Sequence, residues 1–222
     1  MNKLKLVIVG HVDHGKSTLV GRILHETGAL PDGKVEAVKA MSEKRGMPFE
    51  WAFLMDAIQA ERDQGITIDT TQIWFHTLKR PYVIIDAPGH KEFLKNMVTG
   101  AASSEAALLL IDAHEGVQEQ SRRHGYLLHL LGVKQVAVLV NKMDLAGYGE
   151  ERYQEVRRDV AAYLRSIGVN AVDITSPIVS EAATLDEIIT ELETTRVPER
   201  SGRAMDHESE DAFERLRAAG YM

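Results

Sequence analysis

The sequence contains no cysteine. This absence excludes disulfide bonds, thiol catalysis, and zinc or iron–sulfur sites held by cysteine ligands. No apolar run approaches the roughly 20 residues that a membrane-spanning helix needs, and the opening residues lack the apolar length of a signal peptide. The net charge of −7 argues against a nucleic-acid contact made by broad neutralisation of phosphates. We therefore expect a cytoplasmic protein with no membrane partner and no direct nucleic-acid contact.

Of the 222 residues, 44% are hydrophobic and 27% are charged, which is typical of a globular protein with one sizeable core. Apolar strand patterns alternate with helical patterns, and this predicts an α/β fold with a mostly parallel six-stranded sheet and helices on both faces. The predicted strands cover residues 4–10, 67–77, 82–86, 106–112, 135–141 and 172–175. The predicted helices cover residues 16–27, 34–44, 49–63, 91–101, 117–131, 149–167 and 184–192.

The pattern of the last 30 or so residues differs from the rest. We expect residues 1–192 to form one domain and residues 193–222 to form a linker and a short helix. That helix either docks on the domain or binds a partner, and the sequence leaves both alternatives open.

A glycine-rich loop follows the first strand. It has the pattern GxxxxGK[ST], in which the glycines let successive backbone N–H groups point at a polyphosphate. Lys16 would reach the β- and γ-phosphates, and the Ser17 hydroxyl would bind Mg²⁺. The helix that begins here adds its positive N-terminal end. The loop reads Gly10-His11-Val12-Asp13-His14-Gly15-Lys16-Ser17-Thr18, and it predicts a nucleoside triphosphate site.

A second motif, Asn141-Lys142-Met143-Asp144, follows the strand pattern at 135–141. The Asp144 carboxylate can accept hydrogen bonds from N1–H and the exocyclic amine of guanine, whereas adenine presents no matching pair of donors. An unpaired buried carboxylate is costly, so the motif also discriminates by penalty. The Lys142 stem can lie over the base plane. The predicted ligands are GTP and GDP.

A third motif, Asp86-Ala87-Pro88-Gly89-His90, follows the strand at 82–86. Asp86 would bind the Mg²⁺ shell through water, and the Gly89 N–H would contact the γ-phosphate. His90 then lies within reach of the same phosphate, although it could instead be a histidine satisfied by a nearby backbone group. Three such motifs in this order, each at the end of a strand, indicate a P-loop NTPase G domain.

We assign no metal-binding role to the two histidines of the phosphate loop and no partner-binding role to a basic cluster further along the chain. We treat His11 and His14 as loop residues rather than metal ligands, because Mg²⁺ prefers oxygen. The cluster Arg122-Arg123-His124 is interpreted as a solvated helix face rather than a partner site, because charge runs usually are.

The phosphate loop, the Asp86–His90 motif and the run Gly65-Ile66-Thr67-Ile68 together resemble the translation-factor branch of GTPases. Within it, residues 112–124 are similar to the GTPase (large) subunit of sulfate adenylyltransferase, a relative of elongation factor 1-alpha. The resemblance covers about residues 4–168. It implies GTP hydrolysis coupled to formation of adenylyl sulfate from ATP and sulfate on a small catalytic subunit, which is the expected partner. An elongation factor-like GTPase and a stand-alone GTP-dependent switch are the alternatives.

The resemblance also implies roles at matching positions. Thr67 would close over Mg²⁺ and the γ-phosphate, and His90 would orient the attacking water. With Lys16, these two form the expected catalytic set, which acts mainly by stabilising charge. The expected metal ligands are Ser17, Thr67 and Asp86.

The resemblance further implies that Val12 and Ile66 form the apolar pair that gates His90, and that Asp13 helps to hold a monovalent cation. The chain departs from the family in two ways. In the family that it resembles, two β-barrel domains follow the G domain, whereas the residues here up to Met222 are expected to form a linker and a short helix. The turn that supports guanine is degraded, and either Thr175-Ser176-Pro177 or Ser180-Glu181-Ala182 could occupy it.

Overall fold

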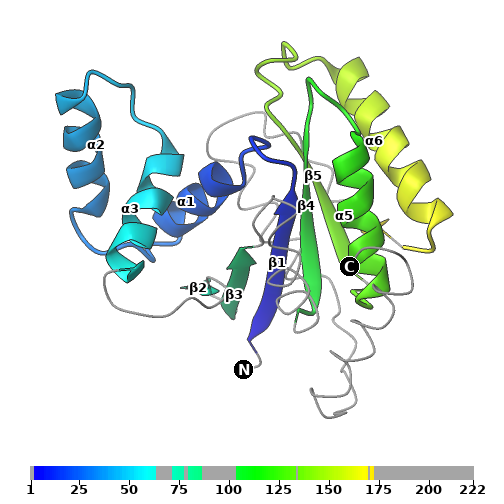
Figure 1. The fold of residues 1–222 in the computed structure, drawn as a ribbon, viewed down its shortest axis with the longest axis horizontal. Coiled ribbons are helices and arrows are strands. Elements are labelled where there is room, and N and C mark those ends of the chain that lie inside the picture. The colour runs from blue at the N-terminus through cyan, green and yellow to red at the C-terminus, as the bar shows by residue number, and fades with distance from the viewer. Residues whose placement is uncertain are drawn as a thin grey trace.

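The computed structural model describes residues 3–63, 72–77, 80–86, 104–133, 135–169 and 171–172, and it arranges them as helices packed around a sheet (Figure 1). Several predicted features lie outside these residues. They are the start of the strand at 67–77, the helices at 91–101 and 184–192, both candidates for the guanine-supporting turn, and residues 193–222.

Six strands form one sheet in the order β2-β3-β1-β4-β5-β6. Every pair is parallel except β2 with β3, which is antiparallel. The strands are β1 (Leu4–Gly10), β2 (Gln72–His76), β3 (Pro81–Asp86), β4 (Ala106–Asp112), β5 (Gln135–Asn141) and β6 (Ala171–Val172). This confirms the predicted mostly parallel six-stranded sheet.

The strand register brings the predicted motifs to one edge of the sheet. Gly10 at the end of β1 lies beside Leu110 of β4, and Asp112 at the end of β4 lies beside Asn141 at the end of β5. Because parallel strands share a direction, their carboxyl ends meet at the same edge, where ligands of open α/β sheets bind.

Helices cover both faces of the sheet (Figure 1). On one side α3 packs against α1, and the two helices approach closely because residue 21 is a glycine: a Cβ there would lie 2.7 Å from the Trp51 carbonyl oxygen. On the other side α5 and α6 pack together over β4 and β5. The helices are α1 (Lys16–Glu26), α2 (Lys34–Lys44), α3 (Trp51–Asp63), α5 (Glu119–Leu130) and α6 (Glu150–Ser166).

The central strand β1 supplies both halves of the core. Leu6 and Ile8 point to the side of α1 and α3, whereas Val7 and Val9 point to the side of α5 and α6. This alternation explains the uninterrupted apolar run, because a strand covered on both faces buries every side chain. Each large apolar side chain that is fully buried contributes about 1.5–3 kcal/mol, so the two-sided burial anchors the loop that follows β1.

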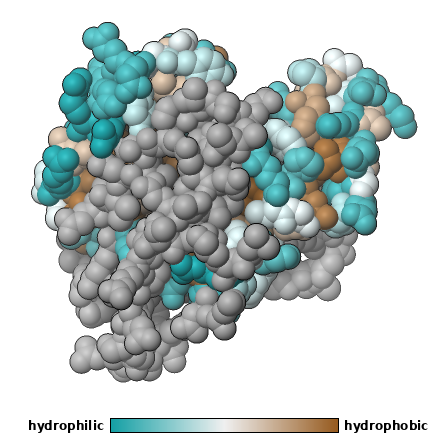
Figure 2. Space-filling view, turned by 180° about the vertical axis from the view of Figure 1, so that it is seen from behind, coloured by the Kyte–Doolittle hydropathy of each residue, from teal (hydrophilic) through white to brown (hydrophobic). Residues whose placement is uncertain are grey.

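The large apolar side chains that are exposed among the described residues are Met41, Met47, Trp74, Leu145 and Tyr148. Figure 2 shows apolar side chains among polar ones over the lobe formed by α2 and α3. Within the part of the chain that the structure describes, no helix combines the length and apolar content that crossing a bilayer requires.

Candidate nucleotide-binding site

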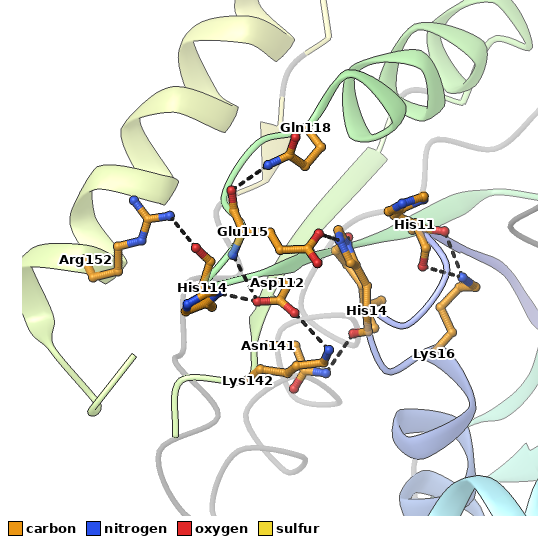
Figure 3. Close-up of polar contacts among 12 residues, drawn as sticks. His11, His14, Lys16, Asp112, His114, Glu115, Gln118, Asn141, Lys142 and Arg152 are labelled. Carbon is orange, nitrogen blue, oxygen red and sulfur yellow. Dashed lines mark hydrogen bonds and ion pairs between the residues drawn. The ribbon is translucent and has the colours of Figure 1, made fainter. Parts of the chain in front are cut away.

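The glycine-rich loop connects β1 to α1 through two residues in the left-handed region, Asp13 with φ 65° and Gly15 with φ 87°. The Lys16 ammonium donates to the carbonyls of Gly10 and His11, at 2.8 Å each, and so lies across the loop (Figure 3). The first turn of α1 holds no acidic side chain. The positive end of this helix is therefore available to an anion.

A side chain from β5 ties the loop to the second motif. The Asn141 amide Nδ2 donates to the His14 carbonyl oxygen at 2.9 Å (Figure 3). A Cβ at Gly15 would lie only 2.3 Å from that nitrogen, and the positive φ there already favours glycine. The glycine thus serves the backbone turn and the contact with Asn141 at once, and the structure brings together two motifs that the sequence analysis paired only by order.

The His14 ring points away from the loop toward β4 and is fully buried. Its Nδ1 lies 3.1 Å from the Leu110 carbonyl oxygen and donates to it, because a carbonyl only accepts. Its Nε2 lies 3.2 Å from Glu115 Oε2, and this contact is an ion pair when the ring carries its second proton. The ring supports the loop from behind, while the His14 carbonyl faces Asn141.

The second motif alternates between core and surface. Asn141 reaches the phosphate loop, and Met143 is 2% exposed within the core shared by α5 and α6. Asp144 is exposed to solvent, as a carboxylate that accepts from a ligand must be before the ligand arrives. Lys142 has a positive φ of 59°, and its ammonium forms an ion pair with Asp112 Oδ2 at 2.9 Å.

Asp112 closes the turn that follows β4. Its Oδ1 accepts from the backbone N–H groups of His114, at 2.8 Å, and Glu115, at 3.3 Å. Burial of the carboxyl opposes its ionisation, but the hydrogen bonds from Lys142, Glu115 and His114, with the Lys142 charge, outweigh burial and hold the pKa of Asp112 below its ordinary value. Asp112 is therefore an anion at neutral pH.

Arg152 of α6 braces the same turn from outside. Its Nε donates to the Ala113 carbonyl at 2.7 Å, and its Nη2 donates to the His114 carbonyl at 3.1 Å. A Cβ at Gly116 would lie 2.9 Å from that Nη2, and the positive φ of 73° at this residue also favours glycine. Glu155 accepts from the third nitrogen of the group. Residues 112–116 are thus held by β4 on one side and α6 on the other.

A buried histidine lies behind the phosphate loop on α5. His124 is 4% exposed, and its Nδ1 has no hydrogen-bond partner among the described residues. Burial, followed by the positive charges of Lys16, His11 and His14, lowers the pKa of His124 to about 4. The prediction of a solvated face at 122–124 is wrong at His124, whereas Arg122 is exposed as expected. Because successive residues of a helix point in different directions, His124 is buried while Arg122, two residues earlier, is exposed.

The residue chemistry fits a polyphosphate with a guanine base. An anion fits the phosphate loop, which has Gly15 at its tightest point, the Lys16 ammonium across it and the N-terminus of α1 beside it. A base with adjacent donors fits the exposed carboxylate of Asp144. The sequence matches the family described as the elongation factor Tu GTP binding domain over residues 1–204. The chain belongs to this family.

Relatives of the G domain carry the name elongation factor 1-alpha. The chain is 45% identical to that of Methanospirillum hungatei over 168 residues, which cover 75% of this chain and 40% of the relative. It is 48% identical to that of Thermoplasma acidophilum over 170 residues, or 74% of this chain and 40% of the relative. The chain therefore spans about two fifths of the length of these relatives.

A solved structure shows the same fold. The G domain resembles the crystal structure of a bacterial selenocysteine-specific elongation factor with a TM-score of 0.61 and 24% identity, covering 88% of this chain and 30% of that chain. This likeness agrees with the P-loop GTPase fold that the three motifs predicted.

The comparisons correct the more specific part of the sequence analysis. The expected partner, a small catalytic subunit of sulfate adenylyltransferase, is wrong, because relatives at 44–46% identity are elongation factors 1-alpha. The expectation of no direct nucleic-acid contact, which rested on the net charge of −7, is also contradicted, because these relatives are elongation factors. The similarity of residues 112–124 to the sulfate-activating subunit was local, whereas the match to elongation factors extends over most of the chain.

The predicted site residues of the G domain divide into two groups. Residues 10–18 and 141–144 lie together at the carboxyl edge of the sheet. The backbone of Asp86 ends β3, whereas Thr67 and residues 87–90 lie outside the described residues.

The sequence analysis missed three side chains that hold this site: Asp112, Glu115 and Arg152. A carboxylate at the end of a buried strand, in line with the other motifs, was the signal available for Asp112. For Glu115 and Arg152 no local pattern was available, because their partners are distant in the chain.

Proposed function

We propose that this chain binds GTP with Mg²⁺ and hydrolyses GTP as the GTPase domain of a translation elongation factor of the 1-alpha type. The observation that carries the proposal is the Asn141–His14 hydrogen bond, which joins the loop that fits a polyphosphate to the loop that fits guanine. The elongation factor part of the proposal rests on the relatives at 44–48% identity.

The base and the phosphates would divide between the two loops. Asp144 would accept from the guanine donors, and the Lys142 stem would lie along the base. The backbone N–H groups of residues 10–18 would bind the phosphates, with Lys16 at the β- and γ-phosphates. Asn141 would hold the phosphate loop through its hydrogen bond to His14, and Met143 would fix the base loop by packing in the core.

Ser17, Thr67 and Asp86 would hold Mg²⁺, which supplies charge neutralisation during phosphoryl transfer. Lys16 would stabilise charge on the transferring group, Thr67 would close over the γ-phosphate, and His90 would orient water beside Gly89. Asp13, exposed and in the left-handed region, would contribute to a monovalent cation site. Slow basal hydrolysis follows, because no arginine lies two residues before Thr67 to act in cis; that position is Gly65.

The partners in this proposal are the ribosome and aminoacyl-tRNA in the cytoplasm, which the resemblance to translation factors implies. Residues 1–192 would form the nucleotide-binding domain and residues 193–222 a linker with a short helix. A ribosome-stimulated rate of GTP hydrolysis, measured by phosphate release, would support this part of the proposal. A rate that stays basal on adding ribosomes would contradict it while leaving nucleotide binding intact.

The Asp144→Asn variant tests the guanine site directly. The new amide can pair with the extra carbonyl of xanthine, so preference should move from GTP toward xanthosine triphosphate. Glu150→Gln, which removes an exposed carboxylate at the start of α6, is the matched control and should keep the GTP preference. Dissociation constants from fluorescent nucleotide titrations decide the matter. Parental GTP affinity in Asp144→Asn, with no gain for the xanthine nucleotide, would refute the guanine site.

A further inference from the structure

The Asp112 side chain is one of the most buried charged groups among the described residues, at 3% exposure. It stands at the end of β4, directly beside Asn141 in the strand register. Its two oxygens have separate partners: Oδ1 accepts the backbone N–H groups of His114 and Glu115, and Oδ2 accepts Lys142. Because the turn needs only Oδ1, the contact with Lys142 is not required to close the turn.

Lys142 is held at both ends. Its backbone follows Asn141, which is fixed to the phosphate loop, and lies in the left-handed region at φ 59°. Its ammonium is fixed by Asp112, while the side chain as a whole remains 29% exposed. Lysine loses more side-chain entropy on ordering than most residues. A lysine already ordered by the protein does not lose that entropy when a ligand covers it.

We propose that Asp112 is a positioning residue for base recognition, which anchors the Lys142 ammonium so that the lysine stem stands ready against the guanine plane. This inference rests on the proposed guanine site at residues 141–144. Asp112 itself does not touch the nucleotide; it acts through Lys142.

The turn that carries Asp112 is braced well enough to serve as an anchor. Arg152 of α6 binds the carbonyls of Ala113 and His114, and Glu115 contacts the buried His14 ring. Figure 3 shows these contacts gathered around the Asp112 carboxylate, between α6 and the phosphate loop. The anchor is therefore fixed to elements on both sides of the base loop.

The Asp112→Asn variant separates the two tasks of the side chain. The asparagine carbonyl oxygen can still accept the two backbone N–H groups, but its amide cannot accept from Lys142. The dissociation constants of GDP and GTP should both rise about tenfold, because a charged hydrogen bond is lost at a group common to both ligands. Glu119→Gln, which removes the exposed carboxylate that pairs with Arg123, is the control and should bind GDP as the parent does.

A double-mutant cycle with Lys142→Gln distinguishes positioning from general support of the fold. If Asp112 acts through Lys142, the Asp112→Asn/Lys142→Gln double variant binds GDP as Lys142→Gln alone does. A further loss in the double variant would overturn the inference, because Asp112 would then act by another route. Should Asp112→Asn fail to fold, by circular dichroism, Lys142→Gln alone still tests the inference, because parental GDP affinity in that variant would mean that Asp112 has no lysine contact with the base to position.

Two further results would also overturn the inference. Parental GDP affinity in Asp112→Asn would mean that Lys142 needs no anchor. Tighter GDP binding would mean that the ion pair competes with the base for Lys142. Asp144→Asn, measured alongside, keeps the two proposals apart: a shift toward xanthine nucleotides with no effect of Asp112→Asn refutes the anchor alone, whereas no shift refutes the guanine site beneath it.

Discussion

The buried His124 should make the stability of the chain depend on pH in a specific window. Its pKa falls from the ordinary 6.5 to about 4 on folding. Between these values the unfolded chain binds a proton that the native chain does not, so the free energy of unfolding rises with pH there and falls as pH falls. At about 1.4 kcal/mol per pKa unit, the full effect is about 3 kcal/mol. About 2 kcal/mol of it should appear between roughly pH 7 and pH 5.

His124→Gln removes this titration and keeps a polar side chain of similar size. Urea unfolding without nucleotide, followed by circular dichroism at several pH values, should show a smaller loss of stability toward acid than in the parent, by about 2 kcal/mol. The readout is the slope with pH, which a general loss of packing does not mimic. Ser121→Ala, which changes another buried polar side chain of the same helix but removes no titratable group, is the control and should keep the parental slope. Identical slopes for His124→Gln and the parent would refute the reasoning.

Three other variants test the proposed site. Gly15→Ala places a Cβ 2.3 Å from Asn141 Nδ2 at a positive φ, so GDP affinity by calorimetry should fall about 100-fold as strain adds to a broken contact; parental affinity would mean that the loop adapts freely. Thr67→Ala should weaken GTP binding with Mg²⁺ but leave GDP binding nearly unchanged, and equal losses would show a structural role. His90→Ala should bind GTP normally yet lose about 100-fold of ribosome-stimulated hydrolysis in rapid-quench measurements, and an undiminished rate would remove it from the mechanism.

Much of the sheet could be predicted because its strands are short apolar runs that stop where a polar motif begins. The strands at 4–10, 106–112 and 135–141 were predicted with the bounds that the structure has. Burial on both faces gives a continuous apolar signal, and the polar residue after it marks the end. Helix ends were less certain: α3 begins at Trp51 rather than residue 49, and α5 covers Glu119–Leu130 rather than 117–131.

The supporting contacts could not be predicted because they depend on the packing of elements distant in sequence. The Asp112–Lys142 pair needs the register of β4 against β5, and the Arg152 contacts need the rotation of α6 about its axis. The error at His124 had a different cause. Ser121 and His124 are three residues apart and both lie on the buried side of α5. This spacing indicates a shared helix face, but the adjacent arginines led to the prediction of a solvated one.

The contact between Gly15 and Asn141 bears on how such a domain can be altered or inherited. The two residues belong to motifs on opposite halves of the chain, and Asn141 and His14 are 127 positions apart. The Asn141 amide fills the space that a side chain at residue 15 would occupy, so the two motifs depend on each other. A phosphate loop that is transplanted alone onto another strand–helix junction would lack the contact with Asn141. Recombination within this lineage should likewise retain the two segments as a pair, or repair both after a break between them.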